Sequence, residues 1–483
     1  MTNLTEKPYR KWKAHCEFAP VIPIPAGQRV PFGWGTIAID HASGGTATLL
    51  KWPEPAPESE AILAGTAFLR ICVACDVREE KRIDAALARS GRVIGTFDIR
   101  YGYVHQIFEI PIPTADVPEV IREGVSLRMT VGDKPLWIFC DSEHAGIPAA
   151  FQPHVLVGQA DNRLHAFFDQ LKSTASIQPF GWLEGCVVDG LYQMDRSFPH
   201  TGWRETLLAH LNLYFPAAGD KLVMEDHYGV VSDDAFYLDE STLPIAVIAE
   251  IWPDHPILDK AIAYWGSRAH ALTAEGCYTM AYPLTVLARI RNNADLARWA
   301  VRLLLERMNE LADERGLWQC YRPGTNADRY RDWARAYAWY MLGMTRSLIK
   351  LRASDFDIPE TEAIAKEIVR MAELLALHQQ ADGLWLCFVQ DASTGPDTSG
   401  SAGIAAALAE GARNGILPAS FEQNALLALK GLQSYLTPDG LLAGVAQNNR
   451  GGEALQKSDY RVISQMAMGL MGQLTAAVRQ HDA

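Results

Sequence analysis

The segment His270–Leu284, HALTAEGCYTMAYPL, decides the interpretation of this chain. A histidine lies five residues before Glu275, and Gly276 and an apolar run that ends at Pro283 follow it. The pattern predicts a carboxylate where a loop passes into a helix. A helix dipole would lower the pKa of such an acid, so Glu275 could donate a proton only if aromatic neighbours desolvate it. The alternative is a solvated glutamate in the first turn.

On both sides of this segment the sequence is helical. Twelve segments between about residue 158 and the C-terminus repeat apolar residues at i, i+3, i+4 and i+7. Twelve helices joined by short loops make six αα-hairpins, and no strict 34- or 40-residue repeat is present. We therefore expect an (α/α)6 toroid rather than an open superhelix.

Residues 1–150 differ, because short β-branched and aromatic runs alternate there with Gly, Pro and Asp. They predict a β-sandwich domain over 1–150, followed by the toroid over 155–483, and so an α+β fold that is mainly α. The segment 79–91, EEKRIDAALARSG, fits either a helix start or a hairpin arm. Since a toroid mouth needs loops to close it, we expect the sandwich to pack at the rim.

Composition excludes several classes of function. The net charge of −13 argues against nucleic acid or an anionic membrane as partner. No signal-peptide core and no apolar run of membrane-spanning length occurs, so a cytoplasmic location is expected. The eight cysteines are scattered, and the Cys72–Cys75 CxxC lies in a strand-like run, where buried structural cysteines are expected. No metal-ligand or phosphate-loop motif indicates a cofactor, and the oligomeric state stays open.

Two further motifs follow in order, WARAYAWYMLG at Trp333–Gly343 and PDTSGSA at Pro396–Ala402. Together with His270–Leu284 they resemble the unsaturated uronyl hydrolases of glycoside hydrolase families 88 and 105, and the related β-glucuronidase-type family 154. The resemblance covers residues 175–475. It implies a toroid enzyme that removes a terminal uronic acid, expected to be 4,5-unsaturated glucuronyl or galacturonyl, from an oligosaccharide.

The resemblance implies roles for the acids. Glu275 takes the place of the catalytic acid, although the segment is one residue longer than the family pattern and has Glu where Asp is usual. The partner carboxylate lies four residues before a helix-opening proline, which fits Glu240 before Pro244. The adjacent Asp239 is equally eligible, and either acid could simply cap the helix. His270 matches a residue that contacts substrate.

The resemblance also implies a sugar-binding wall. Trp333 and Trp339 match indoles that stack on sugar, and Arg335 matches a guanidinium near the uronate. The family usually has Gly-Asn-Gly inside this motif, whereas this chain has Ala336-Tyr337-Ala338, and Tyr337 is expected to narrow the pocket or replace an amide contact. Ordinary core packing of the tryptophans is the alternative.

Thr398 and Ser399 of the second motif match a wall of the site, or else only cap a helix. Trp182 and Glu184 place an aromatic and an acid at a helix start, which suits a toroid mouth or a capped surface turn. Where the family commonly has a substrate-contacting histidine this chain has Cys320, so Tyr321 or Arg322 would have to replace it.

Three alternatives remain open. A saturated β-glucuronidase of the same fold would use the same two carboxylates as an ordinary glycosidase pair. A toroid polysaccharide lyase would place a Tyr–His pair, and not Glu275, at the centre of the pocket. A non-enzymatic sugar-binding protein would keep the tryptophans but leave the acids solvated.

Overall fold

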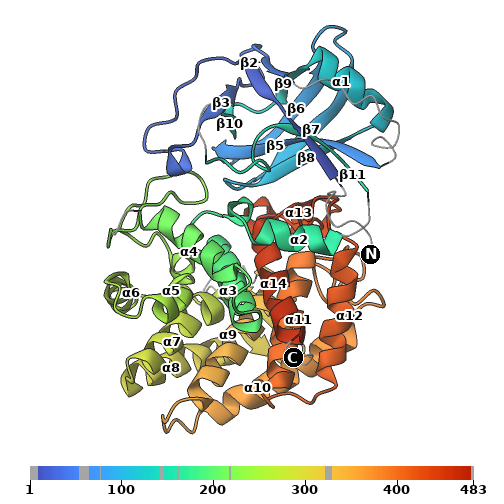
Figure 1. The fold of residues 1–483 in the computed structure, drawn as a ribbon. Coiled ribbons are helices and arrows are strands. Elements are labelled where there is room, and N and C mark those ends of the chain that lie inside the picture. The colour runs from blue at the N-terminus through green and yellow to red at the C-terminus, as the bar shows by residue number, and fades with distance from the viewer. Residues whose placement is uncertain are drawn as a thin grey trace.

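The computed structural model describes residues 9–53, 65–76, 78–141, 146–159, 163–216, 219–320 and 329–479. The protein has a mixed α/β fold, in which a strand-rich N-terminal part lies against a larger helical part (Figure 1). No helix in these ranges is long and apolar enough to cross a membrane.

The strand-rich part contains two antiparallel sheets. The first has the order β1-β11-β5-β10-β3, with β8 also paired to β5. Its central strand is buried along nearly its whole length, as the apolar run TAFLRICVAC predicts, and Cys72 and Cys75 are fully buried within it. The strands are β1 (Tyr9–Lys13), β3 (Thr36–Ile39), β5 (Thr66–Cys75), β8 (Ile107–Ile112), β10 (Leu136–Phe139) and β11 (His154–Gly158).

The second sheet has the order β2-β4-β9-β6-β7. Residues 80–87, whose sequence fitted a helix or a strand, form β6 and pair with β7 over most of their length. Buried and accessible residues alternate along β6, which is the period of a strand with one face in the core. The strands are β2 (His15–Phe18), β4 (Thr48–Lys51), β6 (Glu80–Leu87), β7 (Val93–Arg100) and β9 (Val125–Val131); a short helix, α1 (Val117–Glu123), precedes β9.

The helical part contains all twelve helices that the periodicity predicts, and a short one, α13, that it does not. Small sheets also occur, β12 (Ala312–Asp313) with β13 (Gly316–Cys320) and β14 (Arg329–Arg331), and β15 (Val445–Ala446) with β16 (Arg461–Val462). The helices are α2 (Arg163–Leu171), α3 (Trp182–Ser197), α4 (Trp203–Tyr214), α5 (Ile245–Ile251), α6 (Ile257–Gly266), α7 (Tyr282–Ile290), α8 (Ala294–Leu311), α9 (Ala334–Arg352), α10 (Thr361–His378), α11 (Thr398–Arg413), α12 (Phe421–Gln433), α13 (Gly452–Lys457) and α14 (Gln465–Arg479).

These helices fall into two sets by burial. Helices α3, α5, α7, α9 and α11 are buried on most sides, and α14 contributes a long run of core residues. Within this set, which we call the inner helices, each contacts the next in chain order, and α14 contacts α3. The outer helices α4, α6, α8, α10 and α12 each contact the inner helix before them, and α2 contacts α14.

Glycines allow the inner helices to approach closely. A Cβ on Gly190 of α3 would lie 2.4 Å from the carbonyl oxygen of Gly469 in α14. A Cβ on Gly343 of α9 would lie 2.2 Å from the carbonyl carbon of Cys277. Any side chain at these positions would force the backbones apart, so the glycines fix the spacing between these helices.

Buried charges join the strand-rich part to the helical part. Arg70 of β5 donates from Nη1 to both carboxylate oxygens of Asp439, at 2.8 and 2.9 Å. Lys11 of β1 lies 2.6 Å from the same carboxylate, and Arg70 also pairs with Glu109. Arg70 and Asp439 are both fully buried, and the cations hold the pKa of Asp439 well below its usual range despite its burial.

We expect Asp439→Asn to destabilise the protein by about 3–5 kcal/mol at pH 7, because Lys11 would lose this carboxylate and Arg70 would lose the buried one of its two carboxylate partners. Chemical denaturation measures the loss. Asp439 has a depressed pKa in the folded state, so its contribution is present above the unfolded pKa of about 4 and disappears as the pH falls through the folded value. The difference between the two proteins should therefore shrink in acid.

Asp295→Asn is the matched control, because Asp295 pairs with Arg298 on the surface and is 93% exposed. It should change the free energy of unfolding by less than about 0.5 kcal/mol. Equal effects of the two substitutions would contradict the role assigned to Asp439.

Candidate active site

A cavity of about 170 Å³ gathers side chains from both parts of the protein. Most of its wall is polar or aromatic, and it holds two carboxyl groups and two guanidinium groups. The lining residues are Tyr103, Trp182, His227, Glu240, Glu275, Trp333, Arg335, Trp339, Asn448, Asn449 and Arg450. Six of the residues singled out from the sequence are thus brought together, namely Trp182, Glu240, Glu275, Trp333, Arg335 and Trp339.

Glu275 opens a helix that leads through a π-helical turn, Cys277–Ala281, into α7. The loop before it is held by strand β13, where the backbone N–H of Ala274 donates to the Gln319 carbonyl at 2.8 Å. The Gln319 amide also donates to Glu275 Oε1 at 3.2 Å. Gln319 thus orients Oε1 of Glu275, while the carboxyl group lines the cavity.

The π-helical turn explains the length of this segment. A π-turn accommodates one more residue than the α-helical turn it replaces, and such turns are frequent at functional sites. The extra residue between Glu275 and Pro283, relative to the family pattern, therefore has a place in Cys277–Ala281. Gly276 is required nearby, since a Cβ there would lie 2.3 Å from Nη2 of Arg307. That arginine donates to the carbonyls of Thr273 and Ala271 and so fixes the loop.

The sequence left Glu240 and Asp239 equally eligible as the partner carboxylate, but the two residues have different environments. Both lie in the short 3-10 helix Asp239–Thr242 before α5, and Glu240 lines the cavity. Asp239 does not; its Oδ1 lies 2.9 Å from Nδ1 of His270 and accepts from the Tyr264 hydroxyl at 3.2 Å. His270 in turn contacts the Trp265 carbonyl through Nε2 at 2.6 Å.

The two carboxyl groups of the cavity both bind protons more tightly than usual. Burial and, to a smaller extent, the charge of Glu275 raise the pKa of Glu240 to about 8, and Arg450 opposes the shift. Burial also raises the pKa of Glu275, against the Gln319 hydrogen bond and the charge of Arg335. Two carboxyl groups that share one cavity titrate as a pair, so one of them stays protonated near neutral pH.

Arg335 lies at the start of α9, and groups outside the cavity lining fix the orientation of its guanidinium. Its Nε donates to Ser399 Oγ at 3.0 Å, and its Nη2 donates to the Ala446 carbonyl. Ser399 donates in turn to Asp397 at 2.8 Å, and the guanidinium lies 5.0 Å from the Trp333 ring centre. Ser399 therefore positions Arg335 and is not part of the cavity wall.

Indole rings form the wall beside this guanidinium. Trp182, at the start of α3, meets Trp339 of α9 edge to face, with ring centres 5.7 Å apart. Trp339 also stacks on Tyr278 at 5.9 Å. Such rings offer the flat apolar faces on which sugar C–H groups pack.

Five predicted substrate-binding residues, and Asp239, lie outside the cavity lining. For His270, Asp239 and Ser399 the contacts above explain the placement. Thr398 donates to the Ala443 carbonyl at 2.8 Å. Tyr337 donates to Asp332 at 2.7 Å and does not narrow the pocket, because it is two positions, or about 200°, around α9 from Arg335.

Glu184 also differs from the expectation for a residue at a toroid mouth. It is fully buried, where its carboxylate lies 2.8 Å from Nδ1 of His210 and accepts from the backbone N–H of Gln178. Burial raises its pKa, and His210 opposes the shift. Its contacts are those of a structural hydrogen-bonded pair that holds α3 against α4.

Five lining residues were not among the predicted site residues. Tyr103 comes from the loop between β7 and β8, His227 from the loop after α4, and Asn448, Asn449 and Arg450 from the loop after β15. The only signals for them were the polar triplet at 226–228 and the polar run NNRGG at 448–452.

His227 and Tyr103 lie against each other, with ring centres 5.4 Å apart. Burial, aided by Arg450 and Arg78, lowers the pKa of His227 to about 3, so the imidazole is neutral. Burial raises the pKa of Tyr103 well above its usual range. Both groups therefore keep their uncharged forms at neutral pH.

Arg450 supplies the second cation of the cavity. Its guanidinium lies 5.2 Å from the ring centre of Tyr228 and, within the described part of the chain, makes no hydrogen bond or ion pair. Across the described residues no group of His, Cys, Asp and Glu could hold a metal ion. Cys320 ends β13 beside the Glu275 loop, whereas Tyr321 and Arg322 lie outside the described residues.

The arrangement of paired acids and indole rings on this fold is that of a glycoside hydrolase. Residues 275–478 match the model of Glycosyl Hydrolase Family 88. A search of curated proteins gives no match.

Solved structures resemble the fold at low identity. A possible member of glycoside hydrolase family 105 from Salmonella enterica has a TM-score of 0.54 at 15% identity, over 63% of this chain and 83% of that one. A family 88 glycosyl hydrolase from Bacteroides vulgatus has a TM-score of 0.52 at 16% identity, over 67% and 99%. A polysaccharide lyase has a TM-score of 0.53 at 19% identity, over 67% and 97%.

We expect Glu240→Gln to stabilise the protein at pH 8 by about 1–3 kcal/mol, a range that allows for screening at the cavity mouth. The folded pKa of Glu240, about 8, lies above the unfolded value of about 4.3, so the wild-type protein loses stability as the pH rises between these values. Gln mimics the protonated acid and avoids this loss. Melting temperatures at pH 5 and pH 8 test the trend.

Glu205→Gln, an exposed substitution on α4, is the control and should show no such trend. If Glu240→Gln lowers the melting temperature equally at both pH values, Glu240 does not carry a buried, uncompensated charge.

Proposed function

We propose that the protein is a uronyl hydrolase that removes a terminal, 4,5-unsaturated glucuronyl or galacturonyl residue from an oligosaccharide. One observation carries the proposal: two carboxyl groups with raised pKa values, Glu240 and Glu275, share a cavity with two guanidinium groups, Arg335 and Arg450. The acids can supply a proton at neutral pH, and the cations suit a substrate carboxylate.

In the proposed reaction Glu275 donates its proton to C4 of the vinyl ether. Positive charge develops at C5, and a water molecule adds there while the Glu275 carboxylate takes the proton that the water releases. The resulting hemiketal at C5 collapses, and the glycosidic link breaks. Glu240, with its pKa near 8, stays protonated through the cycle and keeps a second negative charge away from Glu275.

Arg335 and Arg450 would bind the uronate from two directions. Arg335 reaches the cavity from α9, with Ser399 and Ala446 fixing its orientation. Arg450 reaches it from the loop after β15, and in the described ranges its guanidinium has no hydrogen-bond or ion-pair partner in the protein. The sugar ring would pack on Trp182, Trp333 and Trp339.

The proposal includes the finer fold. The chain of contacts from α3 through α14 and back, with six helices outside, supports an (α/α)6 toroid over 155–483. The two paired sheets before it support a β-sandwich domain over 1–150. Tyr103 supports the idea that this domain closes one side of the toroid mouth.

A polysaccharide lyase is the second candidate, and Tyr103 beside His227 favours it, since a Tyr–His pair performs β-elimination in toroid lyases. The pKa shifts argue for the hydrolase. A lyase base must accept a proton, but the pKa of His227 is lowered to about 3 and that of Tyr103 is raised. The acids are shifted in the direction that proton donation needs.

Incubation with unsaturated and saturated glucuronyl disaccharides, and with intact uronate polysaccharides, separates the candidates. The proposed hydrolase consumes the ultraviolet absorbance of the 4,5 double bond. A lyase creates that absorbance from the polysaccharide, and a saturated β-glucuronidase releases glucuronate without any change in it. Only the first outcome supports the proposal.

We expect Glu275→Gln to fold normally and to lower kcat by at least about 10²–10⁴-fold, because the amide cannot donate the proton. The decay of absorbance of the unsaturated disaccharide measures kcat, and circular dichroism reports the fold. Glu205→Gln again serves as the matched substitution. Turnover by Glu275→Gln within a few-fold of the parent would remove Glu275 from the mechanism.

We expect Arg450→Gln to raise KM for an unsaturated uronyl disaccharide by about 10–100-fold, with a smaller effect on kcat, because a charge-assisted contact to the carboxylate is lost. This substitution is cleaner than Arg335→Lys, which would also break the contacts with Ser399 and Ala446. Arg298→Gln, on the surface of α8, should leave KM unchanged. The esterified disaccharide, which lacks the carboxylate charge, should not distinguish Arg450→Gln from the parent; if it does, Arg450 acts otherwise.

A further inference from the structure

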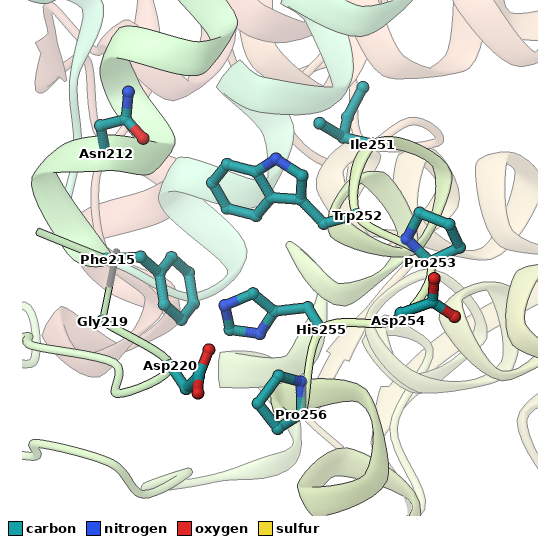
Figure 2. Close-up of a pocket in the computed structure, with 10 residues that line it drawn as sticks. All are labelled: Asn212, Phe215, Gly219, Asp220, Ile251, Trp252, Pro253, Asp254, His255 and Pro256. Carbon is teal, nitrogen blue, oxygen red and sulfur yellow. The ribbon is translucent and has the colours of Figure 1, made fainter. Parts of the chain in front are cut away.

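A second cavity, of about 460 Å³, lies where α4 and α5 end and α6 begins (Figure 2). It shares no lining residue with the cavity that holds the two acids. Glu240 precedes α5 and Trp252 follows it, and the helix has seven residues, so it rises about 10 Å between them. A molecule in the second cavity therefore cannot be the sugar that reacts at Glu275.

Three aromatic rings pack together at its centre. Trp252 and His255 are nearly parallel, with ring centres 5.6 Å apart and an angle of 24° between the planes. Phe215 stands almost perpendicular to Trp252, at 5.9 Å, and packs against His255 at 4.8 Å. Rings this close leave no space for a ligand between them, and Phe215 is buried, so the half-buried rings of Trp252 and His255 form a platform rather than a cage. The C–H face of a pyranose packs on such a surface.

Polar groups border the platform, and Figure 2 shows Asn212 and Asp220 on opposite sides of the rings. Asp254, which precedes His255, adds a further carboxylate. Among the described residues, the side chains of Asn212, Asp220 and Asp254 have no hydrogen-bond or ion-pair partner in the protein.

His255 completes the border as a donor. Its Nδ1 accepts from the backbone N–H of Ile257 at 3.2 Å, so the neutral ring carries its proton on Nε2. Carboxylates that accept, an amide that does both and an N–H that donates match the hydroxyl groups of a sugar.

The charges of this cavity are opposite to those of the first. Asp220 and Asp254 make it acidic, and its lining holds no Lys or Arg; the nearby Lys260 pairs with Asp234. A uronate would be repelled here, whereas a neutral sugar would not. We propose that this cavity is a second carbohydrate-binding site, which takes a neutral pyranose unit of a glycan and takes no part in the reaction.

Saturation-transfer difference NMR on the full chain tests the site, with maltotriose, cellotriose and free glucuronate as probes. At least one neutral trisaccharide should bind with a Kd in the millimolar range, and glucuronate should not compete with it. Trp252→Ala should weaken this binding at least 10-fold while leaving the turnover of an unsaturated uronyl disaccharide unchanged. Trp299→Ala, which removes a half-buried indole on α8 outside both cavities, should retain it.

A second variant covers the case in which Trp252→Ala does not fold. Asp220 is exposed, so Asp220→Lys should fold, weaken binding of the neutral probe and allow glucuronate to compete. Arg450→Gln, which changes only the other cavity, should keep the neutral-sugar binding.

Three results would overturn the proposal: no neutral trisaccharide binds, binding survives both Trp252→Ala and Asp220→Lys, or tetramethylammonium displaces the sugar and marks a cation site. The proposal does not depend on the reaction at Glu275. A failure of uronyl hydrolysis would leave it standing, and a failure of the sugar-binding test would leave the proposed reaction untouched.

Discussion

A single buried guanidinium, that of Arg346, joins most of the inner helices. It lies in α9 and pairs with Asp189 of α3 and with Glu410 of α11. The hydroxyl of Tyr278, in the π-helical turn, donates to the same Asp189 and lies 3.3 Å from Gln473 of α14. A buried charge without such partners would cost several kcal/mol, so the helices that carry these groups must keep their relative positions for the chain to fold at all.

The same group of residues determines the shape of the cavity. Tyr278 stacks on Trp339 with an angle of 11° between the rings, and Trp339 meets Trp182 edge to face. Side chains in a close-packed interior cannot shift alone, so a displacement at Arg346 would reach the indole wall through these two contacts. The π-helical turn brings Tyr278 to this position only three residues after Glu275. The acid and the wall are thus fixed by one local piece of backbone.

This dependence explains how far the sequence could predict the molecule. Apolar periodicity is a local signal, and it predicted all twelve helices, while the loop-to-helix pattern placed Glu275 at a helix start. Arg335 and Trp339 were proposed for the site from the family resemblance. Spacing does not say which way a side chain points, however, so His270 and Ser399 were expected to touch substrate and instead hold Asp239 and Arg335. Neither Tyr103 nor Arg450 was among the predicted site residues, because both are far in sequence from the motifs. They reach the cavity through packing between elements more than 300 residues apart, which no local pattern records.

The two guanidinium groups of the cavity affect the protonation of its two carboxyl groups, so substrate binding and proton donation are coupled. The positive charge of Arg335 opposes the rise in the pKa of Glu275, and that of Arg450 opposes the rise in the pKa of Glu240. A uronate that pairs with the two guanidinium groups would cancel much of this effect, so both acids would hold their protons more tightly once substrate is bound. A neutral sugar would leave the guanidinium charges in place and the acids more readily ionised. The residues that would select the substrate would thus also control the proton that Glu275 must deliver, and selectivity for an anionic sugar would follow from the chemistry as well as from the fit.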